Sequence, residues 1–330
     1  MEWFLLLVGV VAYSQYLSST IELPSDNEYL IFGQHQLTDP NQKKSVKDKK
    51  HNPNAVINIV IHSTEARLGN NMFQYASIYG IYQSMDAAQK HLCVHPQHGL
   101  PFLEDAVVGP LVDNCTHQEL HNVKEIPDTK YATHYEVPFP GCEGSECSYA
   151  LKGYYQSYKY FQGCCQDYIR SVFRFKPSIE EKATAVLRSV EPPIKIGIHV
   201  RRGDMTRRHF YLRDPPLSYY QNAMNHFADR YGSMQFLVAS DDPDWCAQQP
   251  VFQNNNVLIL RNNNNGPVDM AILSKCQHVI LSRGSFGWWA AWLSGASAVY
   301  YKDVFVMEHP ENKGKVKLED HYPNHWIGMT

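Results

Sequence analysis

The chain has 330 residues, of which 44% are hydrophobic and 19% are charged, and its formal net charge at pH 7 is −3. This composition is typical of a folded protein with one large or two medium domains, and it excludes a largely disordered chain. The small negative charge argues against nucleic acid as the main partner.

The N-terminus carries a short apolar segment. Residues 3–13 read WFLLLVGVVAY, and a tolerant count extends the segment to about residue 21. A membrane span needs about 20 apolar residues and a signal-peptide core needs fewer, so a cleaved signal peptide remains an alternative. We expect a retained signal anchor over residues 1–22 and a flexible stalk over residues 23–54. This arrangement predicts a secretory-pathway protein that its N-terminus holds at a membrane.

Cysteine usage and one sequon agree with that compartment. An even number of cysteines in a lumenal protein predicts disulfides, although their connectivity cannot be read from the sequence. A zinc site is the alternative, but the chain has no CxxC pair. Asn114 begins an Asn-Cys-Thr sequon and is the predicted glycosylation site. The eight cysteines are Cys93, Cys115, Cys142, Cys147, Cys164, Cys165, Cys246 and Cys276.

The first half of the chain begins as a strand, a glycine-containing loop and a helix. Residues 55–62 predict a buried strand, residues 63–71 a loop, and residues 72–85 a helix with apolar positions at helical spacing. Residues 93–165 hold six cysteines with many prolines and glycines, so we expect an irregular, disulfide-braced region there. A helix over about 179–190 ends before two prolines, which places a domain boundary near residue 191. The first predicted domain therefore spans residues 55–191.

The second half alternates strands and helices regularly. Such alternation predicts a doubly wound parallel sheet in a second domain, residues 192–330. The predicted strands cover 194–200, 235–240, 257–260, 278–282 and 298–301, and the predicted helices cover 217–231, 244–249, 268–275 and 286–293. We expect the tryptophans of the last helix, Trp288, Trp289 and Trp292, to be core residues rather than ligand contacts.

Polar side chains follow these strands, at the edge where parallel sheets bind ligands. His199, Arg201, Arg202 and Asp204 follow the first strand. Arginine stays charged, and its planar fork fits phosphate oxygens, so this cluster predicts a nucleotide diphosphate site. A solvated turn is the alternative for the arginine pair. Residues 202–204 also spell the adhesive tripeptide RGD, but the adjacent buried strand disfavours an exposed adhesive loop.

Three further segments fit the same site. Ser285 is a natural N-cap for the last helix, whose N-terminus at Ser285 and Phe286 would accept a phosphate. Asp242 and Asp244 form a D-x-D triplet that could hold a divalent cation, although two arginine-bearing loops can neutralise a diphosphate without one. In the first half, Arg67 and Asn70 supply hydrogen-bond donors beside Gly69. A structural turn is the alternative there.

Five ordered motifs resemble the α1,2-fucosyltransferases, the galactoside 2-α-L-fucosyltransferase family. The resemblance covers about residues 60–302. Ala66 and Asn71 depart from it, because the family usually has Gly and Gln there. The motifs are Arg67-Leu-Gly-Asn-Asn-Met-Phe-Gln-Tyr-Ala76, His199-Val-Arg-Arg-Gly-Asp204, Phe236-Leu-Val-Ala-Ser-Asp-Asp242, Asp269-Met-Ala-Ile-Leu-Ser-Lys-Cys276 and Ser285-Phe-Gly-Trp-Trp-Ala-Ala-Trp-Leu293.

The resemblance implies a GT-B-like α/β fold, with two Rossmann-like domains facing a cleft. It implies transfer of L-fucose from GDP-fucose, with inversion and without metal or another cofactor, to a terminal galactose of a glycan acceptor. Arg201 or Arg202 would bind the β-phosphate, Ser285 the phosphates, and His199 and Asp242 the guanine or ribose. Asp204 is the hypothetical catalytic base.

The resemblance also implies a Golgi location, as a single-pass type II membrane protein with a lumenal catalytic domain. Three other functions remain alternatives at this point: a metal-dependent glycosyltransferase, a protein O-fucosyltransferase, and a non-catalytic glycan-binding or RGD adhesion protein.

Overall fold

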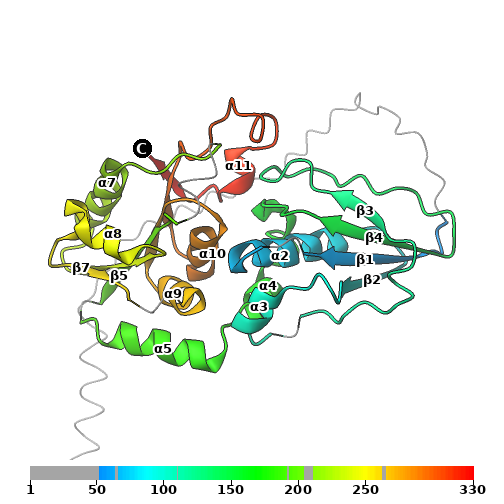
Figure 1. Ribbon diagram of the computed structural model, residues 1–330, viewed down its shortest axis with the longest axis horizontal. Coiled ribbons are helices and arrows are strands. Elements are labelled where there is room, and N and C mark those ends of the chain that lie inside the picture. Colours follow the sequence, from blue (N-terminus) through cyan, green and yellow to red (C-terminus); the bar gives the residue numbers. More distant parts are fainter. Residues whose placement is uncertain (1–51, 64–65, 110, 192, 204–210, 262–264) are drawn as a thin grey trace, which may run out of the picture. The chain divides into compact units, whose positions relative to one another are not determined.

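Two parallel β-sheets organise the chain in this computed structural model (Figure 1), which describes residues 52–330 except 64–65, 110, 192, 204–210 and 262–264. Both sheets belong to one compact unit, residues 49–330. The predicted anchor and all of the stalk except residues 52–54 lie outside the described residues. Within the described ranges, no helix is both long and apolar enough to cross a membrane.

The first sheet has the strand order β2-β1-β4-β3, and every pair of neighbours is parallel. Its central strand β1 is apolar and buried, as the sequence predicts. Its strands are β1 (Val56–His62), β2 (Gln89–Val94), β3 (Lys124–Pro127) and β4 (Glu146–Lys152). The helical segments of this half are α2 (Leu68–Ser84), α3 (Pro101–Ala106), η1 (Tyr158–Tyr160) and α4 (Gln166–Val172).

The second sheet has the order β10-β9-β8-β5-β6-β7, again parallel throughout. This is the doubly wound pattern that strand–helix alternation predicts. The strands are β5 (Ile194–Val200), β6 (Met234–Ser240), β7 (Val257–Ile259), β8 (His278–Leu281), β9 (Ala298–Tyr301) and β10 (Ile327–Met329). The helical segments are α5 (Pro177–Arg188), α7 (Leu217–Ala228), α8 (Pro243–Gln248), η2 (Pro250–Phe252), α9 (Gly266–Leu273), α10 (Ser285–Ser294) and α11 (Leu318–His321).

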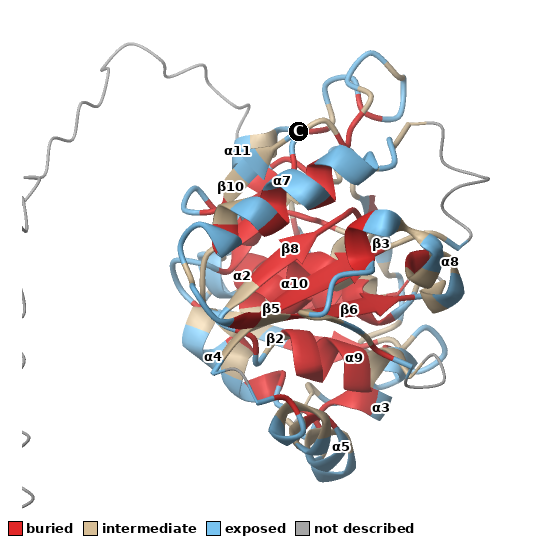
Figure 2. Cartoon of the chain, turned by 90° about the vertical axis from the view of Figure 1, so that its left-hand side faces the viewer, coloured by how far each residue is buried: buried red, intermediate tan, exposed pale blue. Residues whose placement is uncertain are grey.

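An aromatic core joins the two sheets where α2 packs against α10, side by side in Figure 1. Trp288 and Trp289 of α10 are fully buried, which confirms their prediction as core residues. The Phe73 ring of α2 lies 4.5 Å from Trp288 and 5.0 Å from Trp289, between ring centroids. Phe161 stacks on Trp289 from the first half of the chain. Figure 2 shows the same burial around α10 and the central strands β5, β6 and β8.

Six of the eight cysteines form disulfides, all within the region that the sequence predicts to be disulfide-braced. The pairs are Cys93–Cys115, Cys142–Cys147 and Cys164–Cys165, whereas Cys246 and Cys276 are buried and free. Asn114 is exposed beside the first of these bridges, so its side chain is accessible to a glycosylating enzyme.

The structure corrects three expectations about individual elements. Helix α2 begins at Leu68, not at residue 72, so Gly69 and Asn70 lie in its first turn rather than in a loop. The region 93–165 is not wholly irregular, because β4 forms part of the first sheet, with Ser148 beside Asn58 of β1. The second sheet does not end at residue 301, since β10 pairs with β9.

Candidate active site at the junction of the two sheets

The turn after β5 presents two arginines that one carboxylate holds in place. The Arg201 guanidinium nitrogen Nη1 lies 2.7 Å from Asp241 Oδ2. The backbone N–H of Arg202 donates to Asp241 Oδ1 at 2.8 Å, and the Arg202 guanidinium stacks 4.0 Å above the Trp245 ring. Asp241 comes directly after β6, the neighbouring strand, so the sheet itself sets the positions of both arginines.

A third arginine, Arg283, lies in the turn between β8 and α10. It is 1% exposed, and its Nη2 lies 2.6 Å from Asp214 Oδ1. Burial lowers the pKa of Arg283, and the nearby charges of Arg201 and Arg202 lower it further, although Asp214 raises it. The Nε atoms of Arg202 and Arg283 are buried and find no hydrogen-bond acceptor among the described residues. Such donors call for an explanation, and an anionic ligand supplies one.

His199, the second-last residue of β5, is buried against α10. It is 4% exposed, and its ring stacks on Phe286 with 5.2 Å between centroids. Burial, together with the charge of Arg201, lowers the pKa of His199 to about 3, so the ring is neutral at physiological pH. A Cβ on Gly287 would lie 2.4 Å from His199 Nδ1, so only glycine allows this contact. Ser282 Oγ lies 3.3 Å from the same nitrogen and accepts from the Arg201 N–H at 2.9 Å.

The N-termini of α2 and α10 meet at this edge. Ser285 Oγ donates to Asn70 Oδ1 at 2.5 Å, and Asn70 also accepts from Gln156 Nε2 at 2.9 Å. A Cβ on Gly69 would lie 2.7 Å from the backbone N of Phe286, so the two helices touch backbone to backbone. Neither N-terminus has a side-chain cap. Two positive helix ends in contact form an anion-binding arrangement.

The capping prediction for Ser285 is wrong. Gly284 is the N-cap of α10, with a φ of 84° that favours glycine, and Ser285 is the first helical residue. Nothing lies within 4 Å of the position that a Gly284 Cβ would take, so this backbone faces open space. The Ser285 hydroxyl is committed to Asn70 across the junction. Arg67 is the N-cap of α2, and it is exposed.

The D-x-D carboxylates have structural partners. Asp242 caps α8, accepting from the Trp245 N–H at 3.0 Å. Asp244 Oδ1 lies 2.7 Å from Arg261 Nη1 in an exposed ion pair. In the part of the chain that the structure describes, the only group with metal-ligand geometry is His91, Cys93 and Glu119, and Cys93 is in a disulfide.

The structure therefore brings together most of the predicted site residues: His199, Arg201, Arg202, Asn70, Ser285 and Phe286. Asp242 belongs to the same edge but is occupied as a helix cap. Asp204, the hypothetical base, lies outside the described residues. Sequence reasoning missed the roles of Asp241 and of the buried Arg283. Arg283 lies between an apolar strand and an apolar helix in the sequence, where little solvent access is expected, and this pattern could have indicated a buried arginine.

Residues 29–330 match glycosyl transferase family 11. The chain belongs to this family. The galactoside alpha-(1,2)-fucosyltransferase 1 of Alouatta belzebul is 27% identical over 290 residues, covering 81% of this chain and 73% of the relative. The Bos taurus protein of the same name is 26% identical over 312 residues, covering 84% and 81%. These matches confirm the resemblance to α1,2-fucosyltransferases.

Two solved structures are similar to this chain at low sequence identity. POFUT1 in complex with GDP-fucose is 12% identical, with a TM-score of 0.47 over 77% of this chain and 100% of the other. The NodZ alpha-1,6-fucosyltransferase soaked with GDP-fucose is also 12% identical, with a TM-score of 0.47 over 79% and 97%.

Proposed function

We propose that this protein transfers L-fucose from GDP-fucose, in α1,2 linkage and with inversion, to a terminal galactose of a glycan. Membership of glycosyl transferase family 11 and the α1,2-fucosyltransferase relatives support the reaction. The observation that carries the assignment of the site is the junction where two uncapped helix N-termini meet beside three arginines. Such a junction suits the diphosphate of a nucleotide sugar.

The mechanism follows from where charge develops. As the bond between the fucose anomeric carbon and the β-phosphate oxygen breaks, the sugar gains positive charge and the departing GDP gains negative charge. Arg201 and Arg202, with the N-terminus of α10, would stabilise the leaving diphosphate more in the transition state than in the ground state. Asp241 holds the two arginines before the donor arrives, so little reorganisation is needed.

The acceptor galactose hydroxyl attacks the opposite face of the anomeric carbon, and its proton goes to a base. We propose Asp204 for that role. Asp204→Asn should then lower kcat much more than it weakens GDP-fucose binding. His199 is a poor candidate, because it is buried and its pKa is lowered to about 3. We further propose that no metal is needed, since the cationic side chains of this site would neutralise the diphosphate.

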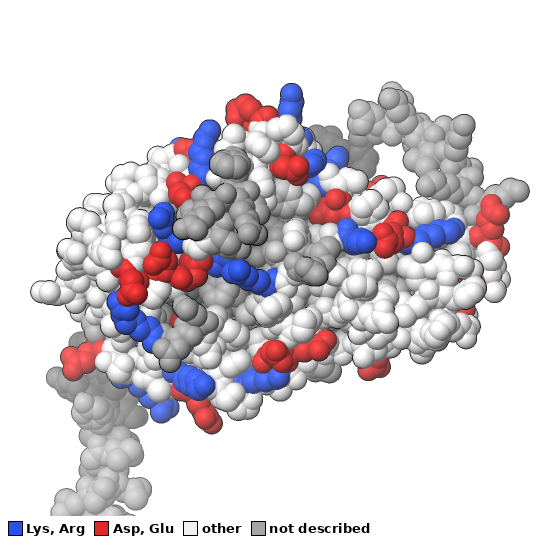
Figure 3. All heavy atoms as spheres, viewed as in Figure 1, with Lys and Arg blue, Asp and Glu red and all other residues white. Residues whose placement is uncertain are grey.

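The remaining features of the family are proposals for this chain. They comprise the GT-B-like pair of Rossmann-like domains, the boundary near residue 191, the anchor over residues 1–22 and a lumenal catalytic domain in the Golgi. The face drawn in Figure 3 intermingles acidic and basic side chains among its described residues, which fits a glycan acceptor better than nucleic acid.

The test is fucose transfer by the full chain in detergent, with GDP-fucose and a panel of β-galactosides, with and without EDTA. We expect acceptor-dependent GDP release that resists EDTA, and a product whose α1,2 linkage is established by NMR. Arg201→Ala should reduce kcat/KM by about 10²–10³, the scale of a lost preorganised donor. Arg230→Ala, an exposed arginine after α7, is the matched control.

Each other outcome points to a different alternative. Loss of activity in EDTA, restored by a divalent cation, would favour the metal-dependent mechanism. Transfer only to a folded protein domain would favour a protein O-fucosyltransferase. Glycan binding without turnover, unaffected by Arg201→Ala, would favour a binding protein.

A further inference from the structure

A row of basic side chains lies across the carboxyl ends of three strands of the first sheet. The register pairs His62, at the end of β1, with Lys152, at the end of β4. On the other side of β1, Ile61 pairs with Val94, which brings His95 next to His62, with 5.1 Å between ring centroids. His95, His62 and Lys152 thus follow one another along the edge of the sheet, on one face.

A fourth basic group completes the row. The ring of His98 stacks on His62, with 4.3 Å between centroids and 13° between ring planes, and lies 4.8 Å from His95. Backbone hydrogen bonds fix this arrangement, because His98 donates to the His95 carbonyl at 3.1 Å and accepts from the Ser63 N–H at 2.9 Å. His62 and His95 are partly buried and His98 is exposed, so the row is held in place and still open to solvent.

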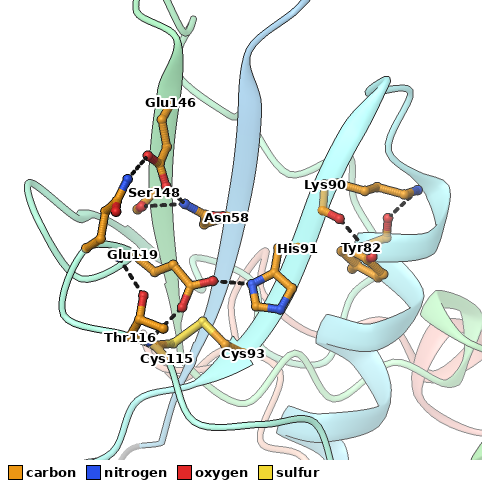
Figure 4. Close-up of polar contacts among 11 residues, drawn as sticks. Asn58, Tyr82, Lys90, His91, Cys93, Cys115, Thr116, Glu119, Glu146 and Ser148 are labelled. Atoms are coloured by element: carbon orange, nitrogen blue, oxygen red, sulfur yellow. Dashed lines mark hydrogen bonds and ion pairs between the residues drawn. A yellow bond between two sulfur atoms is a disulfide. The ribbon is translucent and has the colours of Figure 1, made fainter.

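A second polar row lies on the same face, beyond the apolar row of Val60, Cys93 and Ala150, and its histidine is already paired with a carboxylate. There His91 faces the Glu119 carboxylate, and Asn58 donates to Glu146 at 2.7 Å, as Figure 4 shows. At the strand ends, the acidic group that acts on His62 is Glu125, and it is already 3.2 Å from Lys152 Nζ. Among the described residues, the carboxylates near this row are therefore Glu125, beside Lys152, and Glu104, whose Oε1 lies 3.5 Å from the position that a Gly99 Cβ would take, so the basic groups outnumber the acidic ones.

The row lies on the side of the sheet that carries the candidate active site. His62 ends β1, which leads directly into α2, and the N-terminus of α2 contacts α10. Gln156, which follows the end of β4, hydrogen-bonds Asn70 of that same N-terminus. In parallel sheets the carboxyl edge is where ligands bind. A substrate that reaches the junction from the first sheet would pass along this edge.

We propose that His62, His95, His98 and Lys152 form an acceptor subsite for an anionic group, such as a sulfate or carboxylate on the sugar next to the galactose. The inference rests on the proposed function, because it names the acceptor class of that same site. A metal is not the occupant suggested by the geometry: the rings stack, and among the described residues their nitrogens do not all approach one another within 4.8 Å.

Protonation supports the same conclusion. Burial lowers the pKa of His62, as do His98, His95 and Lys152, while Glu125 raises it. Burial and His98 lower the pKa of His95. The rings therefore repel one another's protons, and a bound anion would offset that repulsion and raise these pKa values. Binding of an anionic acceptor should draw protons from solution and should strengthen as the pH falls from about 7.5 to about 5.5.

The experiment compares a neutral β-galactoside with the same compound sulfated on the sugar next to the galactose. We expect the ratio of kcat/KM values, sulfated over neutral, to rise about fivefold between about pH 7.5 and about pH 5.5. Titration calorimetry in buffers of different ionisation enthalpy, without donor, should show proton uptake with the sulfated acceptor only. The double variant His62→Asn with His98→Asn should lose both the rise and the uptake. His117→Asn, an exposed histidine of the 116–121 segment, is the control and should keep both.

The outcomes separate this inference from the proposed function. Transfer to both acceptors with a ratio independent of pH, and no proton uptake, would overturn the anionic subsite while leaving the fucosyltransferase intact. A pH-dependent ratio that survives in the double variant would also overturn it. Failure of transfer to every acceptor, together with no binding of GDP-fucose, would instead refute the proposed function.

Discussion

Replacing Gly69 with alanine tests whether the contact between the N-termini of α2 and α10 is needed for activity. The new methyl group would lie 2.7 Å from the Phe286 nitrogen and 2.7 Å from the Ser285 carbonyl carbon. Both are backbone atoms, which cannot rotate away as a side chain can, so the helices must separate. Carbon atoms normally pack about 3.5–4.0 Å apart, which makes the required shift about 1 Å.

Two energetic effects oppose each other in this variant. Overpacking costs about 1–3 kcal/mol, while alanine gains up to about 1 kcal/mol over glycine in a helix. We therefore expect a net loss of stability between about 0 and 3 kcal/mol. Activity should suffer more, because a displacement of about 1 Å in a catalytic arrangement costs about 10²-fold in rate.

The assay measures kcat/KM with GDP-fucose together with the midpoint of thermal unfolding. We expect kcat/KM to fall about 10²-fold while the protein remains folded at the assay temperature. Gly163→Ala is the matched control, since nothing lies within 4 Å of that added methyl, and it should leave both quantities near the original values. A Gly69→Ala protein with undiminished kcat/KM would refute the idea that the helix contact positions the phosphate site.

Asp241→Asn should raise KM for GDP-fucose at least about tenfold, because the neutral amide loses the ion pair that holds the Arg201 guanidinium in position. Replacing Cys93 and Cys115 by serine should cost about 3 kcal/mol of unfolding free energy, because the bridge closes a loop with a sequence separation of 22. Burial lowers the pKa of His199 to about 3 and of His321 to about 4. The unfolded chain therefore binds more protons below about pH 6.5, so stability should fall as the pH drops from there to about 4, by up to about 1.4 kcal/mol per unit per histidine.

Controls and contrary results follow from the same structure. Asp229→Asn, at the exposed end of α7, should leave KM unchanged. If it changed KM as much as Asp241→Asn does, the effect at Asp241 would not come from holding the two arginines. The Cys142–Cys147 bridge has a sequence separation of only 5 and should contribute less than Cys93–Cys115. A midpoint of thermal unfolding that stays constant between about pH 6.5 and about pH 4 would show that the buried histidines do not take up protons on unfolding.

The second sheet could be predicted well because each of its strands except β10 is an apolar run followed by a polar turn. Strand β5 spans the seven residues that its sequence predicts, and α10 ends at Ser294, one residue after the predicted end, with Gly295 following in the left-handed conformation. The short edge strand β10 could not be found in this way, because three residues carry no periodic signal.

The first sheet is harder to predict because one of its faces carries polar side chains among its apolar ones. Strand β4 reads ECSYALK, in which Ser148 hydrogen-bonds Asn58 across the sheet, and β2 carries His91 on the same face. Such strands lack the apolar run of a fully buried parallel strand. The start of α2 was misplaced for a related reason: glycine and asparagine predict a loop, but here Gly69 is required by the close approach of α10.

The kinds of residue at the candidate site could be predicted from the sequence, whereas the hydrogen bonds and ion pairs between them could not. The sequence places Arg201, Arg202 and Ser285 after strands, and the sheet topology then brings them to one edge. The hydrogen bond between Ser285 and Asn70 joins residues 215 positions apart, so no local pattern could reveal it.

Helix α10 is held at both ends by residues from the first half of the chain. Asn70 binds its N-terminus, and the Arg170 guanidinium donates to the carbonyls of Trp292 and Leu293 at its C-terminus, at 2.8 and 3.1 Å. Arg170 also stacks 4.1 Å above the Trp292 ring. Cutting the chain at residue 191 would separate the tryptophans of α10 from the aromatic rings of the first half that pack on them, and it would expose a large apolar surface. The two halves should therefore not be separable folding units, and expressing either alone should yield aggregated protein.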